Sequence, residues 1–299
     1  MTVPEKNLIG TSFSGTPFSS EQACVVYLFR KRWPRGFKCP FCGTVQQEIA
    51  PAYAVVCRYC RKQISITAHT LMHGSKKSLV AWMRVSWKFC SQGISARELQ
   101  RLMELSCYQT AWSWLQKIRC GAALAESAPC GDIVLFDLLP LPTAAFFPKT
   151  VTSIGMALEL SHSSPKRVRL IVLQTSSSRV ITAAVNQLVE KRATLLIRNR
   201  QWLSDECQVA SELCGQPTGE QLERGHFLLD QAVSWLNTVY RKAVNPCHLQ
   251  GYLDEFCFRH NTASWPDPFT ILDHLLTGLL STVGEPYRAK RSTITGAIS

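Results

Sequence analysis

Four cysteines near the N-terminus stand in two pairs of equal spacing, Cys39-x2-Cys42 and Cys57-x2-Cys60, with fourteen residues between the pairs. A Cys-x2-Cys turn can present two thiolates to one metal ion, and two such turns supply the four ligands of tetrahedral zinc. Gly43 follows the first pair and lets that turn close. The alternative is four ordinary core thiols in a chain with 13 cysteines, but the shared spacing favours a structural Zn²⁺ site of the zinc-ribbon type.

Length and composition bound the architecture that must position these residues. A chain of 299 residues exceeds one typical domain, so two or three modules are expected. Hydrophobic residues make up 46% and charged residues 18%, which is typical of a globular protein. No stretch reaches the roughly 18 apolar residues that a membrane span needs, and no secretory segment is seen. We therefore expect a soluble protein of the reducing cytoplasm, with no membrane partner.

The net charge of +12 is unevenly distributed along the chain. Residues 1–130 contain 17 Lys and Arg against 6 Asp and Glu, whereas residues 131–299 contain 16 against 15. A basic front half is the electrostatic footprint of a polyanion partner, which predicts nucleic acid. The alternative is a solvated basic surface that keeps the protein soluble.

Helical patterns follow the cysteine module. The first predicted helix covers Leu79 to Gln92, and its apolar face consists of Leu79, Trp82, Met83, Ser86 and Phe89. Gly93 ends that helix. Ser95 and Glu98 form a capping box that starts a short helix from Ala96 to about Leu105. His69 and His73 precede these helices and are interpreted as structural or phosphate-facing, because four thiolates already complete a zinc site.

A third helix begins after Ser106, and the three together are typical of a helix-turn-helix unit. Its predicted core positions are Ala111, Trp112, Leu115 and Ile118. Its other side carries polar side chains, Gln116 among them, and the last helix of such a unit lies in the major groove. The candidate DNA-binding residues are Gln109, Thr110, Ser113, Lys117 and Arg119. The alternative is a trihelical packing module without a nucleic-acid role.

The front half resembles bacterial insertion-sequence transposases that join a zinc ribbon and helix-turn-helix to an ISXO-like DDE-type domain. The stretches that carry the resemblance are Phe18–Glu21, Arg32–Pro34, the two Cys pairs, Ser65–Thr70, Leu79–Trp82, Gly93–Ala96, Thr110–Trp112 and Lys117–Arg119. His248 to Asn261 is similar to the C-terminal signature of the family. The resemblance implies an RNase H-like catalytic domain with a mixed sheet flanked by helices.

The fold class expected from these features is multidomain α+β. An N-terminal arm and zinc ribbon would occupy residues 1–75, a helix-turn-helix module 76–128, an RNase H-like domain 129–262, and a C-terminal helix with a basic tail 263–299. Within the third module, the expected elements are strands at 131–137, 151–160, 168–175 and 193–197 and a helix at 180–189. The helix over Phe269 to Leu280 is expected to pack on that domain.

DDE chemistry uses carboxylates to hold two divalent cations about 4 Å apart. The resemblance places the first carboxylate at Asp137, the second at Asn199 and the third near Gln231 ahead of Trp235, with Asp230 and Ala232 as other alignments. Two of the three positions therefore lack the acid, and Arg198 would bring positive charge to the metal site. Rescue by Asp230 or by Asp205 and Glu206 is a weaker alternative.

The expected function is that of a bacterial protein of transposase descent that binds the terminal repeats of an insertion sequence as double-stranded DNA. The resemblance predicts structural Zn²⁺, with Mg²⁺ only if the protein is active, and strand cleavage impaired or lost. A homo-oligomer is a further expectation. Two alternatives stay open: an active transposase, and a zinc-dependent assembly or regulatory protein that does not cleave.

Overall fold

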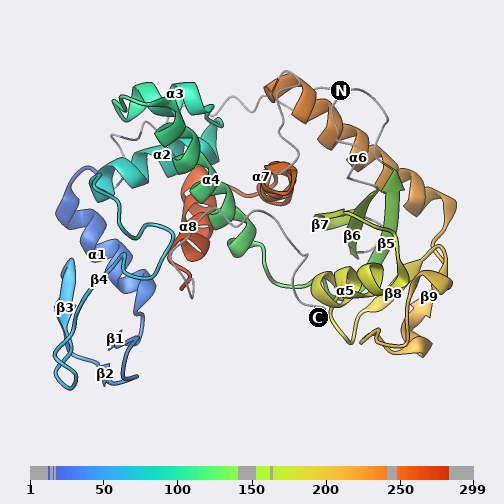
Figure 1. Cartoon of the computed structure of the whole chain (residues 1–299), viewed down its shortest axis with the longest axis horizontal. Coiled ribbons are helices and arrows are strands. Elements are labelled where there is room, and N and C mark those ends of the chain that lie inside the picture. The colour runs from blue at the N-terminus through green and yellow to red at the C-terminus, as the bar shows by residue number, and fades with distance from the viewer. Residues whose placement is uncertain are drawn as a thin grey trace. The chain divides into compact units, whose positions relative to one another are not determined.

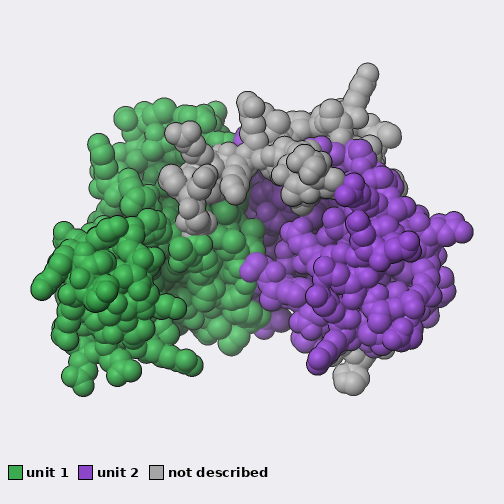
Figure 2. All heavy atoms as spheres, turned by 60° about the horizontal axis from the view of Figure 1, so that its bottom comes forward, with its two compact units in different colours: residues 1–125, 265–289 green, residues 126–264, 290–299 purple. Residues whose placement is uncertain are grey.

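The computed structural model of the protein describes residues 13 and 16 and the ranges 18–140, 153–161, 164–240 and 248–282. The chain forms two compact units (Figure 2). Unit 1 contains residues 1–125 and 265–289, and unit 2 contains residues 126–264 and 290–299. The second unit is thus inserted, in sequence, between two parts of the first.

Unit 1 begins with a helix and two short hairpins (Figure 1). Helix α1 (Glu21–Arg32) is capped by the Ser20 hydroxyl, which accepts the Ala23 N–H at 3.2 Å. The antiparallel hairpins are β1 (Phe37–Lys38) with β2 (Val45–Gln46) and β3 (Ala54–Val56) with β4 (Gln63–Ser65). Each hairpin carries one Cys-x2-Cys pair, so these strands position the thiols.

Three helices follow in unit 1: α2 (Leu79–Ser91), α3 (Ala96–Leu102) and α4 (Tyr108–Ala125). The predicted apolar face of α2 is confirmed, because all five of its residues are buried. Gly93 has φ +82 after α2, and its N–H donates to the carbonyl of Lys88, so the predicted stop is confirmed. The capping box of α3 is also confirmed, with Ser95 and Glu98 each accepting the other's backbone N–H.

Helix α8 (Pro268–Leu279) belongs to unit 1, so the expectation that it packs on the domain at 129–262 is wrong. Asp267 caps the helix by accepting the Thr270 N–H at 2.9 Å. A Cβ added at Gly278 would collide with the backbone carbonyl of Gly121 in α4. The two glycines therefore let α8 and α4 pack backbone to backbone. The predicted basic tail beyond residue 282 and the predicted arm at residues 1–12 lie outside the described residues.

Unit 2 is built on one mixed sheet in the order β7-β6-β5-β8-β9. The strands are β5 (Ile133–Pro140), β6 (Ser153–Ser161), β7 (Ser164–Leu173), β8 (Thr194–Ile197) and β9 (Cys214–Gly215). β5, β6 and β7 pair antiparallel, whereas β8 runs parallel to both β5 and β9. The predicted mixed sheet is confirmed. Of the strand predicted at 151–160, residues 151 and 152 lie outside the described residues.

Helices cover both faces of this sheet (Figure 1). On one face, α5 (Ser178–Leu188) packs Ile181, Val185 and Leu188 against Val134 and Phe136 of β5. The other face is covered by α6 (Gly219–Tyr240) and α7 (Leu249–Thr262), which share a core with inward residues of β5, β6 and β7. Two short 3-10 helices, η2 (Arg200–Trp202) and η3 (Ser211–Leu213), lie between β8 and β9. β5 is therefore central and buried on both faces.

Amide side chains from α7 form hydrogen bonds with the outer edge of β7. Gln250 accepts the N–H of Val172 at 2.8 Å and donates to the carbonyl of Leu170 at 2.9 Å. Asn261 does the same with the N–H and C=O of Val168, at 2.9 and 3.1 Å. These side chains substitute for a neighbouring strand, so α7 protects an edge that could pair with another chain.

Candidate functional site

The two cysteine turns have the same backbone geometry. In the first, the N–H of Cys39 donates to the carbonyl of Thr44 and the N–H of Gly43 to the carbonyl of Cys39, both at 2.9 Å. In the second, Cys57 bonds to Lys62 at 2.9 Å and Arg61 to Cys57 at 3.0 Å in the equivalent way. Gly43 and Arg61, which follow the pairs, both have left-handed backbones, with φ +73 and φ +60. The two Cys-x2-Cys pairs thus share one turn conformation.

The four thiols converge on a site suited to one metal ion. All four Sγ atoms lie within 4.8 Å of one another, and Cys39–Cys60 and Cys42–Cys57 are each 3.6 Å apart. A tetrahedral zinc with Zn–S bonds of about 2.3 Å needs sulfurs roughly 3.8 Å apart. The donors therefore fit the Zn²⁺ that the sequence predicts. Bound zinc would join the two hairpins and stabilise the module.

Arg32, at the end of α1, attaches that helix to the ribbon. Its guanidinium donates to the carbonyls of Ser65, Ile66 and Ala68 at 3.0, 2.7 and 2.6 Å. Burial lowers the pKa of Arg32 to about 10. Sequence reasoning missed this role, because three backbone carbonyls have no sequence signature.

The candidate DNA-contacting residues on α4 differ in accessibility. Gln109, Thr110 and Ser113 are exposed near the start of α4, as expected of groove-reading side chains. Lys117 is half-buried, and desolvation lowers the pKa of its ammonium group. The prediction that Arg119 faces outward is wrong, because its side chain is only 1% exposed. Gln116, also predicted outside, is buried at 6%.

The core side of α4 also differs in one position. Ala111, Leu115 and Ile118 are buried as predicted, but Trp112 is only half-buried. The buried tryptophan is Trp114, which stacks on Trp82 of α2 with ring centroids 3.9 Å apart. Several faces of α4 are buried because α2, α3 and α8 all contact it. Only its first turn and a narrow stripe thus stay accessible.

A charged cluster surrounds Asp137 on β5 in unit 2. Asp137 is fully buried, and its Oδ1 accepts the N–H of Leu138 at 2.9 Å. Its Oδ2 accepts from the guanidinium of Arg198, which follows β8, at 2.5 Å. His226 of α6 places Nε2 3.8 Å from the same oxygen and 3.2 Å from Arg198. The side chains of Arg198 and His226 are about half-exposed, at 45% and 47%, so the cluster reaches the surface.

The predicted positions Asn199 and Gln231 do not supply acid. Asn199 is exposed, and its side chain accepts the N–H of Gln201 at 2.9 Å to cap η2. Gln231 is half-buried on α6, five residues beyond His226. Five residues advance a helix by about 7.5 Å and turn it to another face. His226 of α6 does lie beside Asp137, and the family resemblance did not single it out.

The donors around Asp137 do not fit a pair of divalent cations. Both oxygens of the carboxylate are already hydrogen bonded, one of them to a permanent cation. Mg²⁺ is usually held by one or two carboxylates together with water and substrate phosphate. A guanidinium at this place repels a second cation, and the nearby imidazole offers no negative charge.

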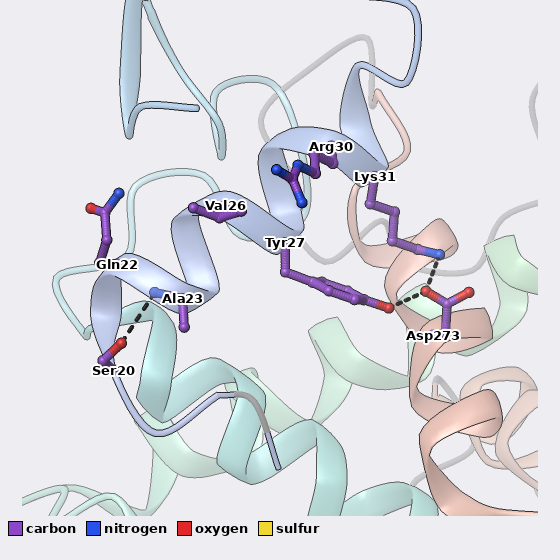
Figure 3. Close-up of a pocket in the computed structure, with 8 residues that line it drawn as sticks. All are labelled: Ser20, Gln22, Ala23, Val26, Tyr27, Arg30, Lys31 and Asp273. Carbon is purple, nitrogen blue, oxygen red and sulfur yellow. Dashed lines mark hydrogen bonds and ion pairs between the residues drawn. The ribbon is translucent and has the colours of Figure 1, made fainter. Parts of the chain in front are cut away.

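A shallow groove of about 780 Å³ lies along α1 (Figure 3). Tyr27 and Lys31 of α1 both donate to Asp273 of α8, Lys31 at 2.6 Å. Burial would raise the pKa of Asp273, but these hydrogen bonds lower it. Burial likewise raises the pKa of Tyr27, together with the bond to Asp273. The polar groups of the groove thus tie α1 to α8.

Comparison with known proteins identifies one region. Residues 19–63, which hold α1, the first hairpin and the second hairpin up to the start of β4, match the family model described as the transposase zinc-ribbon domain. Together with the four-cysteine cluster, the match supports an insertion-sequence transposase N-terminus, and it suggests nucleic acid as the partner. No curated protein and no solved structure matches the chain. In the described part of the chain, no helix has both the length and the apolar character that crossing a membrane requires.

Proposed function

We propose that this protein is a DNA-binding protein of transposase descent whose catalytic domain no longer cuts DNA. In this proposal the ribbon and the helices at 76–128 hold the terminal repeats of an insertion sequence. Unit 2 is an RNase H-like domain of DDE type that has lost its metal ligands. The match of residues 19–63 to the transposase zinc-ribbon domain supports the first part.

The sheet of unit 2 supports the assignment of an RNase H-like domain. It is mixed, with three antiparallel strands followed by two parallel ones, and helices cover both faces. Asp137 lies on its central strand, where the resemblance places the first catalytic carboxylate. Arg198 and Asn199 follow the parallel neighbour β8, where the second would lie.

The ion pair between Arg198 and Asp137 is the main observation that supports the proposed loss of cleavage. Two-metal phosphoryl transfer needs carboxylates that neutralise two ions and align the attacking and leaving oxygens. Here the single carboxylate is neutralised by a guanidinium 2.5 Å away. A divalent ion within about 4 Å of that guanidinium is repelled by several kcal/mol even at an effective dielectric constant of 20. The site is therefore stable without metal.

The DNA-binding part rests on charge and accessible polar groups. The front half of the chain has an excess of eleven positive charges, 17 against 6 over residues 1–130. Gln109, Thr110 and Ser113 are exposed together at the start of α4, where a recognition helix contacts base edges. Arg119 is omitted from this set because it is buried. Phosphate contacts from the basic surface would make binding sensitive to salt.

The test uses zinc-loaded, full-length protein and labelled DNA that carries the terminal repeats flanking its gene. We expect binding that weakens as salt increases and no nicking with either Mg²⁺ or Mn²⁺. Asp137→Ala is the matched control for cleavage. Nicking that this substitution abolishes would contradict the proposal and make the protein an active transposase. Absence of any DNA binding would favour a zinc-dependent assembly protein.

A further inference from the structure

The two cysteine turns of the ribbon each present an aromatic ring to solvent. Phe41 and Tyr59 occupy equivalent positions, directly before the second cysteine of each pair, and are 50% and 78% exposed. Aromatic rings normally contribute most to cores and interfaces, so an exposed pair on a small rigid module is a candidate binding surface. The thiols that flank each ring hold its backbone in place.

The rings of Phe41 and Tyr59 differ in the side chains that contact them. Lys62 places Nζ 3.9 Å from the centroid of the Phe41 ring, and His69 contacts the same ring edge-on at 5.5 Å. In the described part of the chain, Tyr59 has no comparable ring or cation contact. Phe41 is thus partly engaged by its own module, whereas the face of Tyr59 is accessible to a ligand.

A hollow of about 550 Å³ lies beside Tyr59. Its lining consists of Thr44, Val45, Gln46, Gln47, Glu48, Arg58 and Tyr59. Gln46 is fixed, because its side-chain oxygen accepts the N–H of Arg58 at 2.8 Å. Gln47 and Glu48 are exposed and can each offer hydrogen bonds. The hollow combines an aromatic wall, a guanidinium and polar side chains, at a size typical of small-ligand sites.

The lining of the hollow holds one basic residue, Arg58, and one acidic residue, Glu48, but the module around it is basic and favours an anionic ligand. Residues 33–70 contain five basic side chains, Arg35, Lys38, Arg58, Arg61 and Lys62, against one acidic side chain, Glu48. Arg58 and Arg61 flank the second turn on either side of Tyr59 and are exposed. A ligand with a flat ring and an attached phosphate matches this arrangement, and an apolar peptide does not.

We propose that this hollow takes one unpaired base of DNA, stacked on Tyr59, with the adjoining phosphate on Arg58 and Arg61. This inference rests on the proposed DNA-binding function and adds its substrate class. In duplex DNA the bases are stacked inside the helix and cannot reach the ring. The ribbon therefore binds DNA with an opened or unpaired segment more tightly than the matched duplex, because stacking on an aromatic side chain needs a free base face.

The experiment compares two labelled DNAs of the same terminal-repeat sequence, one fully paired and one with a short mismatched bubble. Zinc-loaded full-length protein is titrated into each, and affinity is read from fluorescence anisotropy. We expect the bubble to bind about tenfold more tightly, and Tyr59→Ala to bring the two affinities within about twofold of each other. Tyr59→Phe keeps the ring and retains the preference.

Tyr53→Ala is the matched control, because Tyr53 is 48% exposed on the same module but does not line the hollow. It should leave both affinities unchanged, and zinc content should equal that of the wild type in every variant. Equal affinity of the wild type for both DNAs would overturn the inference, as would equal losses for Tyr53→Ala and Tyr59→Ala. Failure to bind either DNA would instead overturn the proposed function.

Discussion

The ribbon of unit 1 and the Asp137 cluster of unit 2 both gather ligand-type side chains, yet they neutralise charge in opposite ways. In the ribbon, four thiols converge within 4.8 Å with no cationic side chain among them. Around Asp137, a buried carboxylate meets an arginine at 2.5 Å and a histidine at 3.8 Å. In the first cluster a bound metal ion would balance the thiolates, whereas the second already contains its cation.

In the proposed function, unit 2 has lost a metal site without loss of its fold. A buried carboxylate needs an opposite charge, and either a metal ion or an arginine can supply it. In unit 2, Arg198 supplies that opposite charge without a metal ion. In the ribbon, bound zinc would join the two hairpins and add its binding free energy to their stability.

Removal of one thiol tests the ribbon side of the comparison and should have the largest effect. Cys57→Ala removes a buried ligand, so zinc should be lost and the ribbon should unfold, since structural zinc contributes of the order of 10 kcal/mol. Unit 2 should keep its structure. Zinc content by mass spectrometry and proteolysis of residues 36–66 provide the measurement. Cys107→Ser, an exposed thiol outside the cluster, should retain one zinc.

Removal of the Arg198 side chain tests the Asp137 cluster of unit 2. Arg198→Leu leaves Asp137 buried without its cation and should lower the free energy of unfolding of unit 2 by about 1–3 kcal/mol, measured by urea denaturation. The value is moderate because Arg198 is half-exposed. The double variant Asp137→Asn with Arg198→Leu should recover most of the loss. Equal destabilisation of the single variant Arg198→Leu and of the double variant would show that the ion pair has no role in stability.

Asp254 on α7 sharpens the comparison, because it is a carboxylate whose side chain bonds to an amide, Gln250, at 2.8 Å instead of to an arginine. Burial raises its pKa to about 6. The folded state therefore holds the proton more tightly than the unfolded state, and this contribution to stability is lost as pH rises from about 4 through 6. Asp254→Asn should be more stable than wild type by about 1–2 kcal/mol near pH 8 and equal to it below about pH 4. A difference that does not change with pH would contradict this account.

The smallest expected effect separates the two turns of the ribbon. Arg61 holds the left-handed backbone that Gly43 holds in the first turn, and a side chain there costs about 1 kcal/mol. Arg61→Gly should therefore raise the stability of the zinc-loaded ribbon slightly, by at most about 1 kcal/mol, whereas Gly43→Ala should lower it by a similar amount. Thermal unfolding of the two variants in the presence of zinc measures both. Changes of the same sign would show that the turns are not equivalent.

Features set by neighbouring residues could be predicted from the sequence. The cysteine spacing, the capping box at Ser95 and the stop at Gly93 are local patterns, and the structure reproduces each of them. The family resemblance likewise located β5 and β8 to within a few residues. These elements depend on short-range hydrogen bonding and hydrophobic periodicity, which the sequence contains directly.

Features set by distant parts of the chain could not be predicted. Periodicity identified α8 but not its partner, because the contact between Gly278 and Gly121 joins residues far apart in sequence. Burial of Arg119 was missed because α2, α3 and α8 leave α4 little free surface. His226 was missed because the register of α6 against β5 is fixed by packing, such as that of Gly225 on Met156 and Leu135.

Binding of Mn²⁺ to the zinc-loaded, full-length protein tests the central claim most directly. Electron paramagnetic resonance of free Mn²⁺ during a titration counts the ions that the protein holds. The account predicts no specific Mn²⁺ site in the wild type, and the same result for Asp137→Ala. Two bound Mn²⁺ ions that disappear in Asp137→Ala would contradict it, because they would show that unit 2 still assembles a catalytic metal pair in spite of Arg198.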